Sequence, residues 1–536
     1  MEAGYGDGVP DLVKRFVVYF YRHIRERNIR EIQSMYEVSF AKLTDRFFKA
    51  SSWPPANLVA GLVDGDHVFC LLYQEMYFRH LYAVTQPSLQ QRVESWQNYQ
   101  ALFNVILRGN VNMQLPNVWL WDMVDEFIYQ FQSFAQYRGR LHEKSAEEVA
   151  LLRKACASGF WDISQVLTYL QALADKSGIA QDLSTSSSEQ RLAQTDGYEA
   201  QRSNVLKMLG YYSLLGLLRV HSLVGDYHGA LKALAPLNPF KRKNLLTPRI
   251  AGANITLYYY AGFAYLMQQR YLDAATCFNT ILGYIARVKQ QYQRSSQYDQ
   301  ILKKNEQLYA LLALTLALCP AAQRCVDEVI INTLREKHGD KMHRMVQRGD
   351  GLHDELFGYA CPKFVTAAPP KLDGSHIGVN TNQEAYRLQL RCFLGQVTTQ
   401  STLPGLKQTL KLYTSISLPK LAVLMEQDQA AVRSQLMTLK ASSSCKTWSG
   451  QGDAAEGTMQ PAIDVDFYID TDPETSVEMV TISDVKPVRR HGEFLARHIS
   501  KFEDIIRDLN APPPAATPGA TPAARAPSGP SAVAAY

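Results

Sequence analysis

Residues 257–278 read LYYYAGFAYLMQQRYLDAATCF, and this stretch decides the fold. Tyrosines stand here among alanines and a glycine, so two interpretations are open. The hydroxyl groups could form a chemical site, or the rings and small residues could mark the place where two helices pack. The spacing of the residues distinguishes between these interpretations.

The spacing follows the tetratricopeptide repeat, whose pattern is aromatic, apolar, Gly, aromatic, Ala and Phe. Gly262 and Ala274 leave room for two helix backbones to approach, while aromatic rings fill the space around them. We therefore interpret the tyrosines as packing residues and not as a chemical site. The matching positions are Tyr258, Ala261, Gly262, Tyr265, Ala274 and Phe278.

A second copy of the pattern lies upstream, in residues 213–234, SLLGLLRVHSLVGDYHGALKAL. Its Ala230 corresponds to Ala274, which makes the repeat longer than the usual length of about 34 residues. We predict a right-handed, TPR-like solenoid of helix pairs with elongated helices or loops. The exposed surfaces of such a solenoid bind other proteins.

Composition bounds the class of protein. With 536 residues, of which 46% are hydrophobic and 20% charged, the chain can bury a large core in several domains or a stacked array. A formal net charge of +5 is mild, so contact with RNA is permitted but not required. The eight cysteines include no CxxC pair, which favours a reduced, cytoplasmic protein.

Nothing in the sequence indicates secretion or a membrane. The first residues, MEAGYGDGVPDL, lack the basic flank and apolar run of a signal peptide. The longest apolar run, from Leu308 to Cys319, has about a dozen residues, whereas a membrane span needs about 20.

Helical spacing dominates from Asp11 to about residue 360. We predict a flexible N-terminus over residues 1–10, N-terminal helical layers over 11–180, and the TPR-like repeats over 201–400. Residues 181–200 include STSSSEQRLAQTDG, which is too polar to pack and is predicted to be a polar loop.

The pattern changes after residue 400, and we predict a winged helix over residues 401–485. Three short helices are indicated first, with Pro419 at the start of the second. Two β-rich runs, VDFYID and EMVTIS, follow and predict a hairpin, which is the wing. A polar insert over residues 441–460 is predicted to be a flexible excursion between the third helix and this hairpin.

The predicted winged helix carries candidate RNA contacts. Arg433 and Lys440 share one face of the third helix, because they lie seven residues apart. Together with Lys420 they form only a thin electrostatic footprint. Two interpretations stay open: direct RNA contact, or a solvated polar face in a fold used for protein contacts.

Residues 486–510 are predicted to form a C-terminal helix with an apolar stripe. Its spacing is typical of a coiled coil or helical bundle, but it spans only about two heptads. We expect this helix to join helices of other chains, or else to fold back on its own winged helix. The Ala/Pro-rich tail over 511–536 is expected to be disordered. The stripe consists of Leu495, Ile499, Phe502, Ile506 and Leu509.

An enzyme needs a recognisable constellation of reactive groups. The sequence contains no GxxxxGK[ST], HExxH or GxSxG motif. The best scattered set, His338, His343, His353 and Cys361, does not share one helical face. We therefore expect no catalytic, metal-binding or cofactor-binding residues, no cofactor and no small-molecule substrate.

The plan of helical repeats, winged helix and closing helix resembles the PCI family, found in the proteasome lid, the COP9 signalosome and eukaryotic initiation factor three. The resemblance covers about residues 10 to 510 and is closest to the initiation factor. Its most specific piece is LPNVWLWDMVDEFIYQFQSFAQYR, because a solenoid plan alone would not dictate this sequence. Other matching pieces are LYQEMYFRHLYA, LKLYTSISLPKLA and VDFYID.

The resemblance implies a non-catalytic scaffold subunit of a large cytoplasmic assembly, which binds the small ribosomal subunit and supports recruitment of mRNA and initiator tRNA. The implied partners are other subunits of the same factor, with the K and E subunits nearest. In this family the winged-helix sheets pack side by side and the terminal helices gather in a bundle. The rival interpretation is a scaffold subunit of a proteasome-lid or signalosome complex, which shares the fold and differs in its partners.

Overall fold

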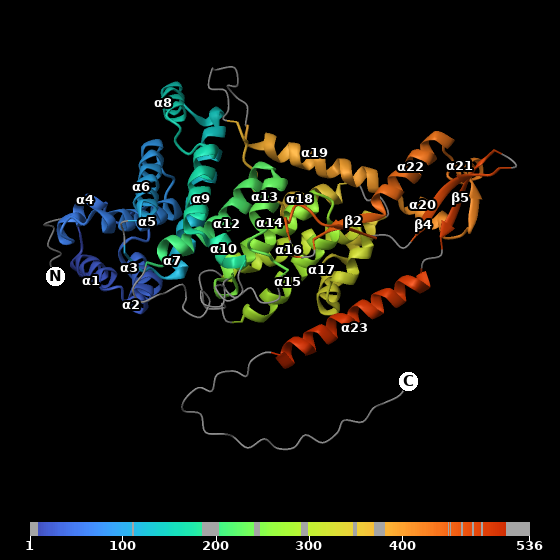
Figure 1. The fold of residues 1–536 in the computed structure, drawn as a ribbon. Coiled ribbons are helices and arrows are strands. Elements are labelled where there is room, and N and C mark those ends of the chain that lie inside the picture. Colours follow the sequence, from blue (N-terminus) through green and yellow to red (C-terminus); the bar gives the residue numbers. More distant parts are fainter. Residues whose placement is uncertain are drawn as a thin grey trace.

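The computed structural model describes residues 9–109, 112–184, 203–240, 247–290, 298–346, 351–368, 381–401, 403–448, 450, 452–461, 465–473, 476–483 and 486–510. Within these residues the chain is mainly helical, with small antiparallel sheets near the C-terminal end (Figure 1). The predicted mainly α class is confirmed.

Helices of the N-terminal layers begin at residues whose side chains accept hydrogen bonds from the free backbone N–H groups of the first turn. Asp66 accepts hydrogen bonds from the backbone at the start of α5, and Ser88 forms a capping box with Gln91 at the start of α6. The elements here are α1 (Asp11–Glu26), α2 (Ile29–Ser34), η1 (Met35–Ser39), α3 (Phe40–Phe47), α4 (Ala56–Val59), η2 (Ala60–Leu62), α5 (His67–Val84), α6 (Leu89–Arg108), α7 (Asn117–Gly139), η3 (Leu141–Glu143), α8 (Ala146–Ala157), α9 (Ile163–Ser177) and α10 (Ile179–Ser184).

The residues that are predicted to form repeats, which we call the repeats below, continue these layers. Their first helix, α12, packs against α7 and α9 of the N-terminal layers as well as against α13 and α14. Asp226 caps α13 by accepting a hydrogen bond from the Gly229 N–H. The elements here are α12 (Val205–Val224), α13 (Tyr227–Leu234), η4 (Thr247–Arg249), α14 (Ala251–Met267), α15 (Tyr271–Val288), α16 (Tyr298–Leu318), η5 (Pro320–Cys325), α17 (Glu328–Val346), α18 (Leu352–Ala360) and α19 (Asn382–Ser401).

Helices α14 and α15 approach closely where Gly262 faces Phe278. A Cβ atom at Gly262 would lie 2.4 Å from the Phe278 Cε1 atom, so any side chain there would overlap the ring. This close approach is the contact that the aromatic and small residues of the pattern predict. The other residues of the pattern, all buried, are Tyr258, Ala261, Tyr265, Ala274 and, in the upstream copy, Ala230.

After α19 the chain forms a C-terminal unit of three helices and a three-stranded sheet in the order β1-β5-β4. The predicted hairpin is confirmed: β4 and β5 pair antiparallel, from Asp466 opposite Ser483 to Thr471 opposite Glu478. Sequence patterns missed β1, which is only three residues long. The elements are α20 (Leu403–Leu410), β1 (Ser415–Ser417), α21 (Leu418–Leu424), α22 (Gln429–Ser442), β4 (Asp466–Thr471) and β5 (Glu478–Ser483).

The repeats and the C-terminal unit have separate hydrophobic cores. Helix α19 connects them: it begins beside α7, where Asn382 Nδ2 donates a hydrogen bond to the Gln136 carbonyl at 2.9 Å. With 20 residues it is roughly 30 Å long. Figure 1 shows this helix running from the N-terminal layers toward α20 and α22.

The predicted polar insert is not a flexible excursion, and that prediction is wrong. It forms an antiparallel pair of β2 (Ser444–Thr447) and β3 (Thr458–Pro461). Although both flanking segments belong to the C-terminal unit, Cys445, Trp448 and Ala454 are buried in the core of the repeats. We call β2, β3 and the described residues between them the insert hairpin.

The ends of the predicted segments agree with the structure to different degrees. Helix α23 (Lys486–Asn510) covers the range predicted for the C-terminal helix. Val9 is buried, and residues 181–184 belong to α10, so the flexible N-terminus and the polar loop are wrong at these residues. Residues 1–8, 185–202 and 511–536 lie outside the described residues.

Replacing Gly262 with Ala tests the close approach of α14 and α15. The added methyl group overlaps the Phe278 ring, and such overpacking destabilises a core by about 1–3 kcal/mol. Gly283→Ala is the matched control, because Gly283 lies in α15 and a Cβ atom added there would have nothing within 4 Å. It should stabilise the helix by about 0.5–1 kcal/mol. Urea unfolding measures both changes; equal effects of the two substitutions would contradict the packing described for Gly262.

Candidate functional site

A buried ion pair lies at the turn between α14 and α15. The Arg270 Nη2 and Nε atoms donate to Asp273 Oδ2 at 2.7 and 3.0 Å, and the two side chains are only 3% and 6% exposed. Burial raises the pKa of Asp273 to about 6, although the Arg270 guanidinium opposes this shift. The carboxylate is therefore ionised at neutral pH, and the pair carries full charges inside the core.

This ion pair binds the insert hairpin. Arg270 Nη1 donates to the carbonyl oxygens of Ala454 at 2.7 Å and Ala455 at 3.4 Å. The Trp448 N–H donates to Asp273 Oδ2 at 3.1 Å. Both partners of the pair thus also satisfy polar backbone groups of the hairpin, which is the requirement for burying charge without a large cost.

Apolar and polar contacts complete this docking. The Trp448 ring meets the Phe240 ring with centroids 5.7 Å apart. Asn238 Nδ2 donates to the Gly450 carbonyl at 2.6 Å. The hairpin is therefore held from both the α13 side and the α14–α15 turn, and it ties the C-terminal unit to the repeats.

The candidate RNA-contacting cations bind groups of their own unit. Lys440 Nζ pairs with the Asp466 carboxylate and donates to the Phe467 carbonyl at 2.8 Å. The hydrogen bond from Lys440 lowers the pKa of Asp466. Arg433 Nε lies 3.3 Å from Glu478 Oε2. These two contacts join α22 to β4 and β5, so both cations contact the sheet of their own unit.

The third candidate, Lys420 on α21, does not join them. Its ammonium lies 5.8 Å from the centre of the Tyr413 ring. The structure therefore brings Arg433 and Lys440 together on α22 and places Lys420 on a separate helix, stacked on an aromatic ring.

The sheet of the C-terminal unit has open edges. Within the described residues, β4 pairs only with β5, and β1 pairs only with β5. Such edges present unpaired N–H and C=O groups that can accept another strand. Tyr468 on β4 is 55% exposed. Leu412 after α20 and Val423 on α21, in the same unit, are more exposed still, at 80% and 78%.

Helix α23 carries its apolar stripe on the surface. All five predicted residues are more than half exposed: Leu495, Ile499, Phe502, Ile506 and Leu509. Figure 1 draws α23 as a separate rod, apart from the helices of the repeats and the C-terminal unit. The alternative that the stripe folds back on its own winged helix does not agree with this exposure. Contiguous apolar surface of this kind marks a contact for another molecule.

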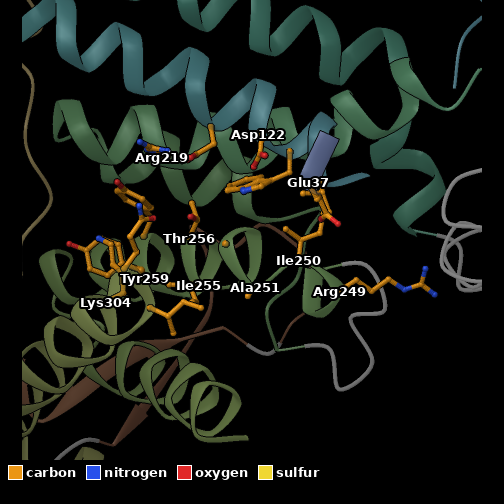
Figure 2. A pocket seen from close by; sticks show the side chains of 17 residues that line it. Glu37, Asp122, Arg219, Arg249, Ile250, Ala251, Ile255, Thr256, Tyr259 and Lys304 are labelled. Carbon is orange, nitrogen blue, oxygen red and sulfur yellow. Dashed lines mark hydrogen bonds and ion pairs between the residues drawn. The ribbon is translucent and has the colours of Figure 1, made fainter. Parts of the chain in front are cut away.

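A cavity of about 380 Å³ lies where the N-terminal layers meet the repeats. Figure 2 shows Asp122 and Glu37 at one end and Lys304 beside Tyr259 at the other. Burial raises the pKa of Asp122 to about 7 and lowers the pKa of Lys304 to about 8. The Lys304 ammonium lies 3.8 Å from the centre of the Tyr259 ring.

Most charges in this cavity already have partners in the chain. Asp122 accepts a hydrogen bond from the Tyr36 hydroxyl at 2.6 Å, and Arg219 pairs with Asp125. These contacts join η1, α7 and α12 around the cavity. We interpret the cavity as the seam between two layers of helices and assign no chemistry to it.

The described residues lack both a membrane-spanning helix and a candidate metal site. They include no helix that is long and apolar enough to cross a bilayer. They also include no group of three or more His, Cys, Asp or Glu side chains placed to hold a metal ion.

Sequence patterns missed the residues that bind the insert hairpin. Arg270 and Asp273 stand next to Ala274 of the repeat pattern, and charges within such an apolar stretch indicate a buried pair. Their partners, Trp448 and the Ala454 carbonyl, lie far along the chain in a polar segment. No local pattern connects the two segments.

These features define the class of the protein: a mainly helical chain that ends in a small unit of helices and antiparallel strands, followed by an amphipathic helix with an exposed apolar stripe. Its surfaces are suited to binding other macromolecules.

Comparison with known proteins identifies the family. A family model described as RNA polymerase I-associated factor PAF67 matches residues 91–502. The chain is 44% identical over 522 residues to eukaryotic translation initiation factor 3 subunit L of Nematostella vectensis, covering 95% of this chain and 96% of the relative. It is 42% identical over 527 residues to the human protein of the same name, covering 94% of this chain and 90% of the relative. The chain belongs to the family of eukaryotic translation initiation factor 3 subunit L.

Replacing Arg270 with Met should release the insert hairpin. The substitution leaves Asp273 as a buried charge without its partner, and breaking such a pair costs about 3–5 kcal/mol. Hydrogen exchange followed by mass spectrometry should show that the amides of β2 and β3 exchange faster than in the unmodified protein. Exchange in the helices should change less.

Lys446→Met is the control for this prediction. Lys446 is exposed, lies in the same hairpin and contacts the same Ala455 carbonyl at 3.4 Å. Its replacement should leave exchange unchanged. If Arg270→Met leaves the hairpin as protected as in the unmodified protein, the ion pair does not hold the hairpin.

Proposed function

We propose that this protein is a non-catalytic scaffold subunit of eukaryotic translation initiation factor 3 and acts in the cytoplasm. In this proposal residues 201–400 form a right-handed TPR-like solenoid, residues 401–485 form the winged helix of a PCI domain, and α23 is a bundle helix. The family relationship supports the role in initiation over the rival proteasome-lid or signalosome interpretation.

The single observation that carries the scaffold role is the exposed stripe on α23. Burying a Leu, Ile or Phe side chain stabilises by roughly 1.5–3 kcal/mol, so five exposed side chains are a strong driving force for association. The apolar stripe, from Leu495 to Leu509, spans only about two heptads, whereas a stable coiled coil needs about three to four. A bundle with helices of several other subunits provides the missing contacts.

The open sheet edges support a second contact of the same kind. A neighbouring subunit with a similar sheet can pair along β4 or β1 by backbone hydrogen bonds, which require no particular side chain. The exposed apolar residues of the same unit, such as Leu412 and Val423, favour a protein partner.

The proposed partners are the K and E subunits of the same factor and, through the assembly, the small ribosomal subunit. Supporting recruitment of mRNA and initiator tRNA is then a property of the whole assembly. Direct RNA contact through Lys420, Arg433 and Lys440 is a weaker proposal, because Arg433 and Lys440 already pair with carboxylates of their own unit.

Replacing Leu495, Ile499 and Phe502 together with Asp tests the scaffold role. The three side chains are 58%, 58% and 61% exposed, so the isolated chain should keep its circular dichroism and unfolding midpoint. Losing three buried anchors should weaken assembly by about a thousandfold or more. Affinity purification with quantitative mass spectrometry should show loss of the other factor subunits and of ribosomal proteins.

A triple substitution elsewhere controls for the added charge. Leu151, Val329 and Leu388 are 56%, 77% and 55% exposed on α8, α17 and α19, and replacing them with Asp adds the same three charges. This variant should co-purify normally. Equal recovery of partners with both variants would contradict the role of α23.

A further inference from the structure

Two cysteine thiols meet where the insert hairpin docks on the repeats. Cys319 directly follows α16, whereas Cys445 lies in β2. The side chains are 7% and 6% exposed, and both line a second cavity, of about 300 Å³. A hydrogen bond joins the two thiols. The fold thus brings together two sulfur atoms from segments that are far apart in the sequence.

Basic side chains line part of the cavity around these thiols. They are Lys407, Lys446 and Arg270, of which Arg270 pairs with Asp273. The Gln269 carbonyl oxygen lies 3.8 Å from Cys445 Sγ. The cavity is large enough for a molecule of the size of water or peroxide. A small oxidant therefore has a route to the sulfur atoms.

The surroundings of the two thiols differ. The hydrogen bond from Cys445, backbone N–H groups of Ala321 and Ala322 and the charge of Lys407 lower the pKa of Cys319 to about 7, although burial opposes this shift. The hydrogen bond to Cys319 and burial raise the pKa of Cys445. At neutral pH one sulfur is available as a thiolate nucleophile beside a second that keeps its proton.

We propose that Cys319 and Cys445 form a peroxide-sensitive dithiol that closes into a disulfide and fastens the insert hairpin to the end of α16. This inference stands on the docking of the hairpin and does not depend on the proposed role in initiation.

The reaction has two steps. The Cys319 thiolate attacks one oxygen of a hydroperoxide, the O–O bond breaks, and Cys319 becomes a sulfenic acid as hydroxide or alkoxide leaves. The Cys445 sulfur then attacks the Cys319 sulfur, the S–O bond breaks, and the released hydroxide takes the Cys445 proton as water. Two electrons pass from the two sulfurs to the peroxide, and a small thiol such as glutathione can reverse the change by exchange.

The disulfide would fix the C-terminal unit relative to the repeats. The hairpin already contacts the repeats through the Arg270–Asp273 pair and Trp448. The disulfide adds a covalent contact that opens only when it is reduced. Because β2 directly follows α22, the sheet edges of the C-terminal unit would be held in one orientation.

Treating the full chain with hydrogen peroxide tests the proposal. After alkylation of remaining thiols and proteolysis, mass spectrometry should find a peptide in which Cys319 is linked to Cys445. Cys392, which is exposed, is the internal control and should stay a thiol at the same dose. In the oxidised protein, hydrogen exchange of the hairpin amides should slow by about tenfold.

Two variants separate the steps. In Cys445→Ser, peroxide should leave a sulfenic acid at Cys319, which dimedone traps as a mass-labelled adduct. In Cys319→Ser, Cys445 should stay unmodified and hairpin exchange should not slow. Oxidation of Cys392 before this pair, or a linked peptide that forms only in urea, would overturn the proposal.

Discussion

The structure depends on the close approach of α14 to α15 at Gly262 and Phe278. This contact fixes the turn between the two helices, in which Gln269 has a left-handed backbone with φ of 60°. The turn also positions the Arg270 guanidinium, which lies 4.7 Å from the centre of the Tyr265 ring. A ring, a glycine and a buried charge therefore act as one unit, and the charge can be held inside the core because the packing around it is rigid.

This unit explains how two separate cores become one protein. Helix α19 alone would be a long connection that allows the C-terminal unit to move relative to the repeats. The insert hairpin adds a second connection, because it leaves the C-terminal unit after α22, enters the core of the repeats through Trp448, and returns to β4. The second connection restricts how the C-terminal unit can move relative to the repeats.

The distribution of polar and apolar groups then follows the role of each surface. Cations of α22 pair with carboxylates of the sheet, so the charges that resemble a nucleic-acid footprint have partners within their own unit. Apolar groups that an isolated chain would bury stay outside on α23. A protein with its polar groups satisfied internally and an apolar helix exposed is suited to association with other chains.

The sequence by itself determined the mainly helical class, the β4–β5 hairpin and the extent of α23, because helical periodicity, strand alternation and turn residues are local signals. It also marked Gly262, since a glycine among rings indicates close helix packing. Only the tertiary structure decided that the polar insert docks on Arg270 and Asp273, and that Cys319 meets Cys445. A polar segment is interpreted as a loop unless its backbone groups find partners in the core. Those partners lie far away in the sequence, whereas a periodic pattern concerns only residues that are close along the chain.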